Sequence, residues 1–299
     1  MVDKRKNAVL GRLAILAVTL IWGSSFVVMK NTLESVTTLY LLAFRFTGAA
    51  LLVALLGARE LKKLDAAYWK GGAIMGLFLF LAYVLQTYGL MHTTPGVNAF
   101  LTATYCVMVP FLNWVFRRKR PGGSSLFAAA ICLLGVGFVS LQGGVRGGLG
   151  EGLTICCGLF FALHIIATTI FVKGRSPVLL TVVQFAVAAA LSWIAAPLLE
   201  TFPGAIERGA VWSLVYLCVM CTATGFLLQT FGQKHTPPAA TAIIMSLEAV
   251  FGVLFSVLLG ERPTIRMCIG FFLIFTAVVV SETKLSFLRK KTEDFTDSE

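Results

Sequence analysis

One passage of this chain occurs twice, and the spacing of the two copies constrains the fold more than any other feature of the sequence. The repeated residues carry numbers 143 apart: Gln86, Thr87, Tyr88, Gly89, His92, Thr93 and Pro95 recur as Gln229, Thr230, Phe231, Gly232, His235, Thr236 and Pro238. Both copies lie between long apolar runs, and each half of the chain holds an odd number of such runs. The second copy therefore enters a membrane upside down relative to the first, which is an inverted repeat.

The composition indicates an integral membrane protein. Hydrophobic residues make up 58% of the 299 positions and charged residues 13%, with a mean hydropathy of +0.86. An apolar helix of about 20 residues crosses the hydrocarbon core, where every backbone polar group has to be bonded internally. We predict an all-α integral membrane protein with ten transmembrane helices as two inverted five-helix repeats, at residues 10–29, 37–57, 70–91, 97–116, 125–142, 151–172, 178–199, 211–231, 238–259 and 265–283.

The distribution of charge predicts the organisation and orientation of the chain. The predicted segments are a cytoplasmic amino terminus, a first repeat, a glycine-rich linker, a second repeat and a polar cytoplasmic tail, at residues 1–9, 10–142, 143–150, 151–283 and 284–299. Of the Lys and Arg residues, 19 fall on the side of the amino terminus, 5 on the opposite side, and Arg45 inside a span. This excess favours a multi-pass protein of the cell (plasma) membrane with both termini in the cytoplasm. Basic loops beside anionic lipid explain the net charge of +11, so no nucleic acid is indicated.

Several kinds of chemistry find no support in the sequence. The cysteines fall inside predicted spans, and the metal-like spacing of Cys218 and Cys221 has no companion pair, so we assign no metal. The linker lacks the Lys followed by Ser or Thr that a phosphate loop needs, so there is no ATP site. Neither HExxH nor GxSxG occurs, and no acid is paired with a base. We therefore predict no enzymatic activity and no cofactor.

Glu248 is the strongest candidate for a functional residue. It lies about ten residues into the helix predicted at 238–259, which places it roughly 15 Å deep, near the midplane. A charge at that depth is costly, so Glu248 is expected to face the interior of the bundle or a wet cavity. Its repeat mate is Tyr105. A neutral carboxyl that only holds two helices together is the alternative interpretation.

Two matching stripes predict a binding site near the midplane. Helical spacing places three side chains on one face of the helix at 97–116, and their mates on one face of the helix at 238–259; the two sets are Asn98, Thr102 and Tyr105, and Thr241, Met245 and Glu248. Inverted-repeat transporters bind their substrates at such a place. A polar contact between helices, without a ligand, stays the alternative.

Four further polar residues lie inside predicted spans. Gln86 and Gln229 occupy matching positions, and we interpret them as polar helix contacts or cavity residues in equal measure. Arg45 lies about 12 Å from the outer end of its helix, so we expect it to snorkel outward, with a structural or gating role. His164 is the histidine that lies deep in a span. It has the chemistry to carry a proton, although a neutral packed imidazole is the stronger interpretation.

Aromatic residues complete the predicted cavity. Trp22 and Phe26 share one face of the first helix, and Tyr83 lies on the third. Such stripes in membranes commonly contact lipid or pack against other helices. If they line the cavity instead, they suit an organic substrate with apolar surface.

Two sets of residues carry a resemblance to a known family: Trp22, Gly23, Ser24, Ser25, Phe26 and Lys30, and Ser246, Leu247, Glu248, Gly260 and Glu261. They resemble the drug/metabolite transporter superfamily in its EamA-like branch, and the resemblance extends from about residue 12 to residue 284. It implies a ten-helix transporter with a central cavity that moves small organic molecules, often amino acids and usually outward. Glu248 and Lys30 fall on the family's acidic and basic positions. Ala249 stands where the family commonly has Pro, so a kink at that position does not carry over.

These features predict a secondary transporter that works by alternating access and exports amino acids or related amphipathic compounds. Glu248 either binds a cationic group or carries a coupling proton, and coupling or gating also involves His164, Arg45 and Lys30. Uncoupled export along a gradient stays open beside proton antiport. A flippase for lipid carriers or other amphiphiles on the same scaffold is the alternative, and a membrane-embedded enzyme is the least favoured. The predicted partners are a small-molecule substrate and membrane lipid, and a homodimer stays open.

Overall fold

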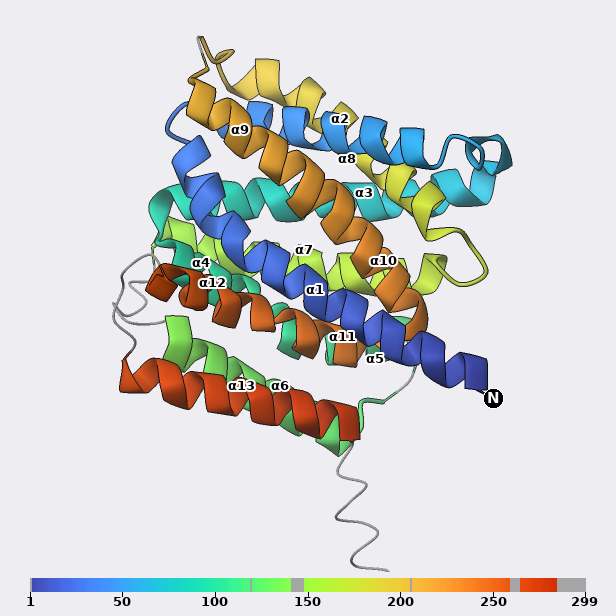
Figure 1. Ribbon diagram of the computed structural model, residues 1–299, viewed down its shortest axis with the longest axis vertical. Helices are drawn as coiled ribbons and strands as arrows, with labels where there is room; N and C mark the ends of the chain where they lie inside the picture. The colour runs from blue at the N-terminus through green and yellow to red at the C-terminus, as the bar shows by residue number, and fades with distance from the viewer. Residues whose placement is uncertain (1, 119, 141–147, 205, 259–263, 284–299) are drawn as a thin grey trace, which may run out of the picture.

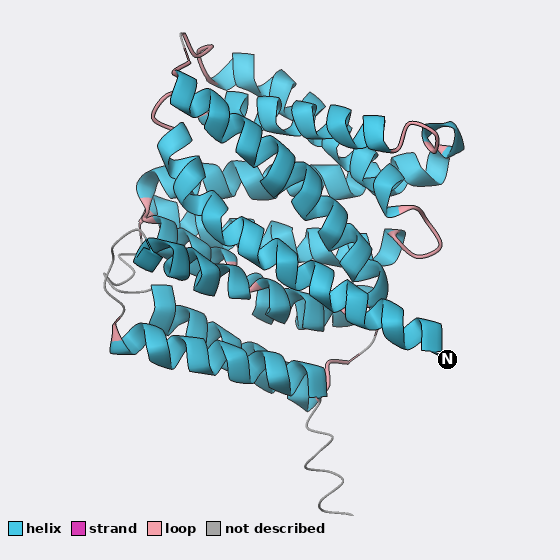
Figure 2. Cartoon of the chain, viewed as in Figure 1, coloured by secondary structure: helices cyan, strands magenta, loops and turns pink. Residues whose placement is uncertain are grey.

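The computed structural model describes residues 2–118, 120–140, 148–204, 206–258 and 264–283. No strand occurs among these residues (Figure 2). The tail at 284–299, most of the linker and the pair Gly260 and Glu261 lie outside the described residues. The helices are α1 (Val2–Thr32), α2 (Thr38–Leu56), η1 (Leu61–Lys63), α3 (Ala66–His92), α4 (Pro95–Thr102), α5 (Tyr105–Arg117), α6 (Gly123–Ser140), α7 (Leu149–Phe171), α8 (Pro177–Leu199), α9 (Arg208–Tyr216), the π-helix η2 (Leu217–Thr224), α10 (Gly225–His235), α11 (Pro238–Met245), α12 (Leu247–Leu258) and α13 (Ile265–Thr283).

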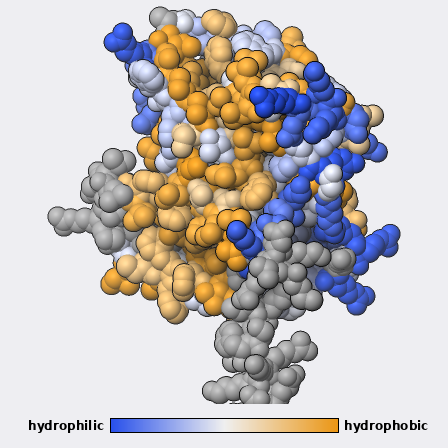
Figure 3. Space-filling view, turned by 45° about the vertical axis from the view of Figure 1, so that its right-hand side comes forward, coloured by the Kyte–Doolittle hydropathy of each residue, from blue (hydrophilic) through white to orange (hydrophobic). Residues whose placement is uncertain are grey.

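The described helices form a multi-pass membrane protein. Seven of them are long and apolar enough to cross a bilayer: Lys6–Thr32, Thr38–Leu56, Ala66–His92, Pro95–Arg117, Leu149–Phe171, Pro177–Leu199 and Arg208–His235. Three shorter apolar helices are Gly123–Phe138, Pro238–Gly252 and Cys268–Val280. Hydrophobic residues cover the middle of the surface in Figure 3, while hydrophilic residues gather along one edge. Of the ten expected spans, seven therefore meet both the length and the hydropathy that crossing requires, within the part of the chain that the structure describes.

The two halves interlock around an approximate twofold axis. α2 packs on α8, and α6 packs on α13, so each of these pairs joins equivalent helices of the two repeats. The two pairs form opposite ends of the molecule, at the top and the bottom of Figure 1. Between them, α1 packs on α10 and α12 of the second half, and α7 packs on α3 and α5 of the first half. Each repeat therefore buries its apolar faces against the other repeat.

Hydrogen bonds at both ends hold α2 and α8 antiparallel. At one end, Glu200 after α8 accepts hydrogen bonds from the backbone N–H of Leu39 at 2.8 Å and from the hydroxyl of Tyr88 at 2.7 Å. At the other end, Ser176 before α8 donates through Oγ to Glu60, which follows α2, at 2.6 Å. A carboxylate at a helix N-terminus also interacts favourably with the helix dipole. Because Tyr88 lies on α3, the same contacts anchor α3 to the pair.

Two helices that the sequence predicts as continuous are each interrupted near the middle. The helix expected at 97–116 is divided into α4 and α5 around Ala103, and the helix expected at 238–259 is divided into α11 and α12 at Ser246. Ala103 and Ser246 are repeat mates, and Ser246 lies three residues before Ala249. Each predicted span therefore contains a short interruption that the sequence did not indicate, and it occurs at the same place in both halves.

Local hydrogen bonds accompany these interruptions. The backbone N–H of Cys106 bonds to the carbonyl oxygen of Ala103 at 3.0 Å, and that of Ala249 bonds to Ser246 at 3.2 Å, so both helices tighten to a three-residue spacing. The hydroxyls of Thr104 and Ser246 each donate to the carbonyl oxygen three residues earlier, at 2.6 Å. Hydroxyl groups that bond locally to the backbone compete with the helical ladder. No Gly or Pro is needed at either position.

Lys30 joins the end of α1 to the end of α3. Its Nζ donates to the carbonyl oxygens of Leu90 at 2.7 Å and of Met91 and Thr93 at 3.4 Å. These are among the last carbonyl groups of α3, which have no partner within the helix and carry the negative end of its dipole. Its repeat mate Lys173 is exposed. Among the described residues Lys173 makes no equivalent hydrogen bond, so the contact of Lys30 fastens one side of the bundle only.

The close approach of α1 and α10 is testable at Gly232. A Cβ at this position would lie 2.5 Å from Cγ1 of Ile15 and 2.7 Å from the carbonyl oxygen of Gly11. We expect Gly232→Ala to lower the free energy of unfolding by about 1–3 kcal/mol, because the backbone of α1 has to move away. The melting temperature of the purified protein in detergent measures this effect. Gly152→Ala on α7 is the control, because its Cβ would meet nothing within 4 Å; equal melting temperatures would contradict the close packing.

Because Lys30 contacts α3 and its repeat mate Lys173 is exposed, we expect the two lysines to differ in their effect on stability. Lys30→Met removes an ammonium donor from the end of α3, and we expect a loss of stability of about 1 kcal/mol. Lys173→Met, the same change at the exposed repeat mate, is expected to leave the melting temperature unchanged. An equal decrease for both variants would show that the charge, rather than the contact with α3, is responsible.

Candidate functional site

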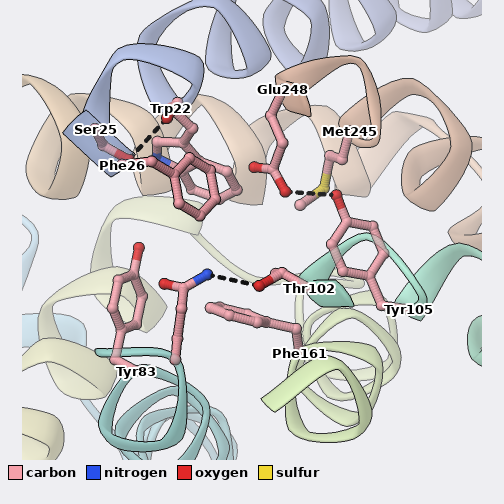
Figure 4. A pocket seen from close by; sticks show the side chains of 10 residues that line it. Trp22, Ser25, Phe26, Tyr83, Thr102, Tyr105, Phe161, Met245 and Glu248 are labelled. Carbon is pink, nitrogen blue, oxygen red and sulfur yellow. Dashed lines mark hydrogen bonds between the residues drawn. The ribbon is translucent and has the colours of Figure 1, made fainter. Parts of the chain in front are cut away.

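A small cavity of about 20 Å³ lies between the two halves (Figure 4). Its wall includes side chains of α1, α3, α4, α5, α7, α11 and α12: Trp22, Ser25, Phe26, Tyr83, Gln86, Thr102, Tyr105, Phe161, Met245 and Glu248. Aromatic rings form much of this wall, and a carboxyl, an amide and hydroxyl groups provide the polar contacts. A predominantly apolar pocket with a few convergent polar groups is typical of a small-molecule site.

Tyr105 and Glu248 bond to each other inside this cavity. The Tyr105 hydroxyl donates to Oε1 of Glu248 at 3.1 Å, and both residues are almost completely buried, with exposed fractions of 1% and 4%. The two residues are repeat mates. A residue touches its own mate only where both lie beside the rotation axis that relates the repeats. The carboxyl of Glu248 is therefore on or near this axis, and its partner is a neutral hydroxyl.

A second pair of mates also meets near the axis. The rings of Tyr83 and Phe226 lie 6.1 Å apart between centroids. Phe226 also packs against Trp22 at 4.9 Å, and Trp22 donates through Nε1 to the carbonyl oxygen of Cys221 at 2.7 Å. Phe161 closes the group, with its ring 5.4 Å from Tyr83. These contacts hold the aromatic wall in one arrangement.

Gln86 and Gln229 make equivalent contacts in the two halves. Gln86 donates through Nε2 to the hydroxyl of Thr102 at 3.2 Å, and Gln229 donates through Nε2 to the sulfur of Met245 at 3.7 Å. Thr102 and Met245 are repeat mates. Each amide therefore fixes the last turn of the interrupted helix beside it, α4 or α11. Of the two amides, Gln86 also lines the cavity.

The structure brings together most, but not all, of the residues that the sequence suggests for the cavity. On the wall are Trp22, Phe26, Tyr83, Thr102, Tyr105 and Glu248. Asn98 instead donates to the hydroxyl of Thr154 at 2.9 Å, and His164 donates through Nε2 to Oε1 of Gln184 on α8 at 2.8 Å. Thr241 is buried, and its hydroxyl finds no partner among the described residues. The common face expected for Asn98, Thr102 and Tyr105 is interrupted, because α4 ends at Thr102.

Arg45 lies inside the protein, so the expectation that it snorkels outward is wrong. Its side chain is 1% exposed. The guanidinium donates through Nη2 to the Tyr83 hydroxyl at 3.1 Å and through Nε to the hydroxyl of Thr222. It also lies 4.5 Å from the centre of the Tyr83 ring. These contacts hold Arg45 behind the cavity wall, whereas Lys30 lies away from the cavity at the end of α3.

Two wall residues were not singled out for the cavity by sequence reasoning: Ser25, which belongs to the family motif, and Phe161, which lies one helical turn before His164. Met245, the mate of Thr102, was expected from the second stripe and lies on the wall. For Phe161, sequence reasoning chose the correct helix but selected His164, one turn later, as the cavity residue. Within the described residues, no group of three His, Cys, Asp or Glu side chains is arranged to hold a metal ion.

Comparisons with known proteins agree with this architecture. The model of the EamA-like transporter family matches residues 9–141 and 148–283, one match for each half. An uncharacterized transporter of Archaeoglobus fulgidus is 32% identical over 276 residues, which cover 90% of this chain and 84% of the relative. The uncharacterized transporter YoaV of Bacillus subtilis strain 168 is 22% identical over 288 residues, which cover 93% and 98% of the two chains.

A solved crystal structure has the same fold. It superposes with a TM-score of 0.78 at 18% identity, over 93% of this chain and 98% of the solved chain. The family model extends over nearly the whole chain, and the archaeal relative is similar over most of its length. The chain therefore belongs to the EamA-like transporter family and is a multi-pass membrane transporter.

Proposed function

We propose that this protein is a secondary transporter of the plasma membrane that exports small amphipathic metabolites, such as amino acids, by alternating access. One observation carries this proposal: the Tyr105–Glu248 pair lies on or near the axis that relates the two halves, in the wall of the cavity between them. A site on such an axis is placed equivalently with respect to both sides of the membrane. Rocking of the halves therefore gives access from each side in turn, without movement of the site itself.

We further propose ten membrane crossings with both termini in the cytoplasm. α6 has 18 residues and α13 has 19, which at 1.5 Å per residue approaches the thickness of about 30 Å that a span has to cover. The described parts of α11 and α12 together extend from Pro238 to Leu258. The excess of Lys and Arg on the side of the amino terminus supports the orientation.

The chemistry of the wall supports an amphipathic organic substrate. Trp22, Phe26 and Phe161 offer aromatic surface, whereas Glu248 and Gln86 offer polar contacts. In the arrangement described here the cavity has a volume of about 20 Å³, so a metabolite enters only when the two halves move apart. Glu248 either receives a cationic group of the substrate or carries the coupling proton. Both roles need a carboxyl group that loses its hydrogen bond to Tyr105 during the transport cycle.

Export is tested by untargeted mass spectrometry of the culture medium. Cells expressing the wild type are expected to release a metabolite that cells with the empty vector do not release, and Glu248→Gln at the same membrane level is expected to abolish the release. Glu34→Gln is the matched control, because this carboxyl is exposed outside the cavity. No difference between wild type and empty vector would contradict export. Scrambling of a labelled lipid in vesicles would then favour the flippase.

The role of Glu248 in coupling is tested in liposomes with the exported metabolite. If Glu248 carries the coupling proton, Glu248→Gln retains exchange of substrate for substrate but loses accumulation driven by a pH gradient, because an amide cannot be deprotonated. Accumulation is measured with and without the gradient. An unchanged dependence on the gradient in Glu248→Gln would exclude the proton-carrier role and leave the binding of a cationic group.

A further inference from the structure

Arg45 is a buried positive charge without a negative partner. Its exposed fraction is 1%. The groups that it contacts are neutral: the hydroxyls of Thr222 and Tyr83, the Tyr83 ring, and the sulfur of Met29 at 3.8 Å. Among the described residues, no carboxylate oxygen lies within 4.0 Å of the guanidinium. Because burying an unpaired charge is costly, the scaffold alone gives no reason for an Arg at this place.

Arg45 of the first repeat contacts Thr222 of the second, and this contact has no equivalent at the repeat mates of the two residues. The repeat mate of Arg45 is Ala188, and the mate of Thr222 is Leu79. Thr222 lies in the π-helix η2, where its hydroxyl donates to the carbonyl oxygen of Leu217, five residues earlier, at 2.7 Å. The equivalent part of α3 is ordinary α-helix. π-helical turns are frequent at functional sites. The Arg45–Thr222 contact between the repeats therefore breaks the symmetry of the described structure.

Tyr83 connects Arg45 to the cavity. Arg45 donates a hydrogen bond to the Tyr83 hydroxyl oxygen, and no described residue accepts the hydrogen of that hydroxyl. A hydrogen bond received at the oxygen polarises the O–H group and makes it a better donor. Tyr83 lines the cavity, and Figure 4 shows it across the cavity from Glu248 and Tyr105. One side of the cavity therefore offers a donor backed by a positive charge, and the other side offers a carboxyl group.

We propose that the cavity binds a zwitterion in a fixed orientation, with its carboxylate at Tyr83 and its ammonium group at Glu248. Arg45 is a positioning residue that acts through Tyr83 and selects substrates that carry an anionic group. The apolar part of the substrate lies against Trp22 and Phe161. This inference rests on the proposed function, in the form in which Glu248 receives a cationic group.

Three related compounds separate the two sides of the cavity. L-Phenylalanine carries both charges, phenethylamine lacks the carboxylate, and 3-phenylpropanoate lacks the ammonium group; leucine, 3-methylbutylamine and 4-methylpentanoate form a second set. Binding to the purified full-length protein is measured as an increase in melting temperature with ligand concentration. We expect the zwitterion of at least one set to bind the wild type more tightly than its two analogues do.

The variants are expected to act selectively. Arg45→Gln and Tyr83→Phe weaken the binding of the zwitterion and the carboxylate by about tenfold or more, since each loses a charge-assisted hydrogen bond, and leave the amine unchanged. Glu248→Gln weakens the zwitterion and the amine and leaves the carboxylate unchanged. Tyr88→Phe is the matched control, because it removes a hydroxyl from the same helix at Glu200, away from the cavity. Tyr83→Phe keeps the test valid if Arg45→Gln does not fold.

Several results would overturn this inference. Equal loss of all three compounds in Tyr83→Phe would show that the hydroxyl only maintains the structure. Tighter binding of an amine than of its zwitterion, or no binding of any zwitterion in the two sets, would show that the cavity does not recognise a carboxylate. The proposed export fails separately, when no metabolite in the medium depends on the wild-type protein. A metabolite that is exported but lacks an anionic group would overturn the role of Arg45 and leave export standing.

Discussion

The rest of the structure depends on the twofold relation between the two halves, and the hydrogen bond between Tyr105 and Glu248 lies beside its axis. A chain with two related halves has a single line along which a residue meets its own mate, and both this pair and Tyr83–Phe226 lie beside it. The pairs α2–α8 and α6–α13 occupy the same line at its two ends. A carboxyl buried in a membrane needs a hydrogen-bond donor. The mate of Glu248 therefore has to lie beside the axis and also has to donate a hydrogen bond.

Symmetry and asymmetry have different roles in this molecule. The interruptions at Ala103 and Ser246 and the amide contacts of Gln86 and Gln229 occur in both halves, so they belong to the scaffold. The contact between Arg45 of the first repeat and Thr222 in the π-helix of the second has no equivalent at their mates, Ala188 and Leu79. The molecule therefore combines a scaffold of equivalent halves with side chains that make one side of the cavity differ from the other.

Much of this arrangement was predictable from the sequence. The repeat offset pairs Glu248 with Tyr105, and the residues around Trp22 and Glu248 resemble the family. The interruptions at Ala103 and Ser246 were not predictable, because Ser and Thr make the same hydroxyl-to-carbonyl bonds in uninterrupted helices, as Ser24 and Ser25 do in α1. The direction of Arg45 was not predictable either. A depth of about 12 Å lets a long side chain reach either the surface or the interior, and the partner in η2 decides between them.

The on-axis pair also bears on how such a chain arises. In a dimer of two identical five-helix chains, the two positions on the axis carry the same residue. Two glutamates would then face each other without a donor when both are ionised, and two tyrosines would leave the site without a carboxyl. Joining the copies in one chain frees the two positions to differ, so that one becomes Glu248 and the other Tyr105. Gene fusion is therefore the event after which this particular pair of residues could be selected.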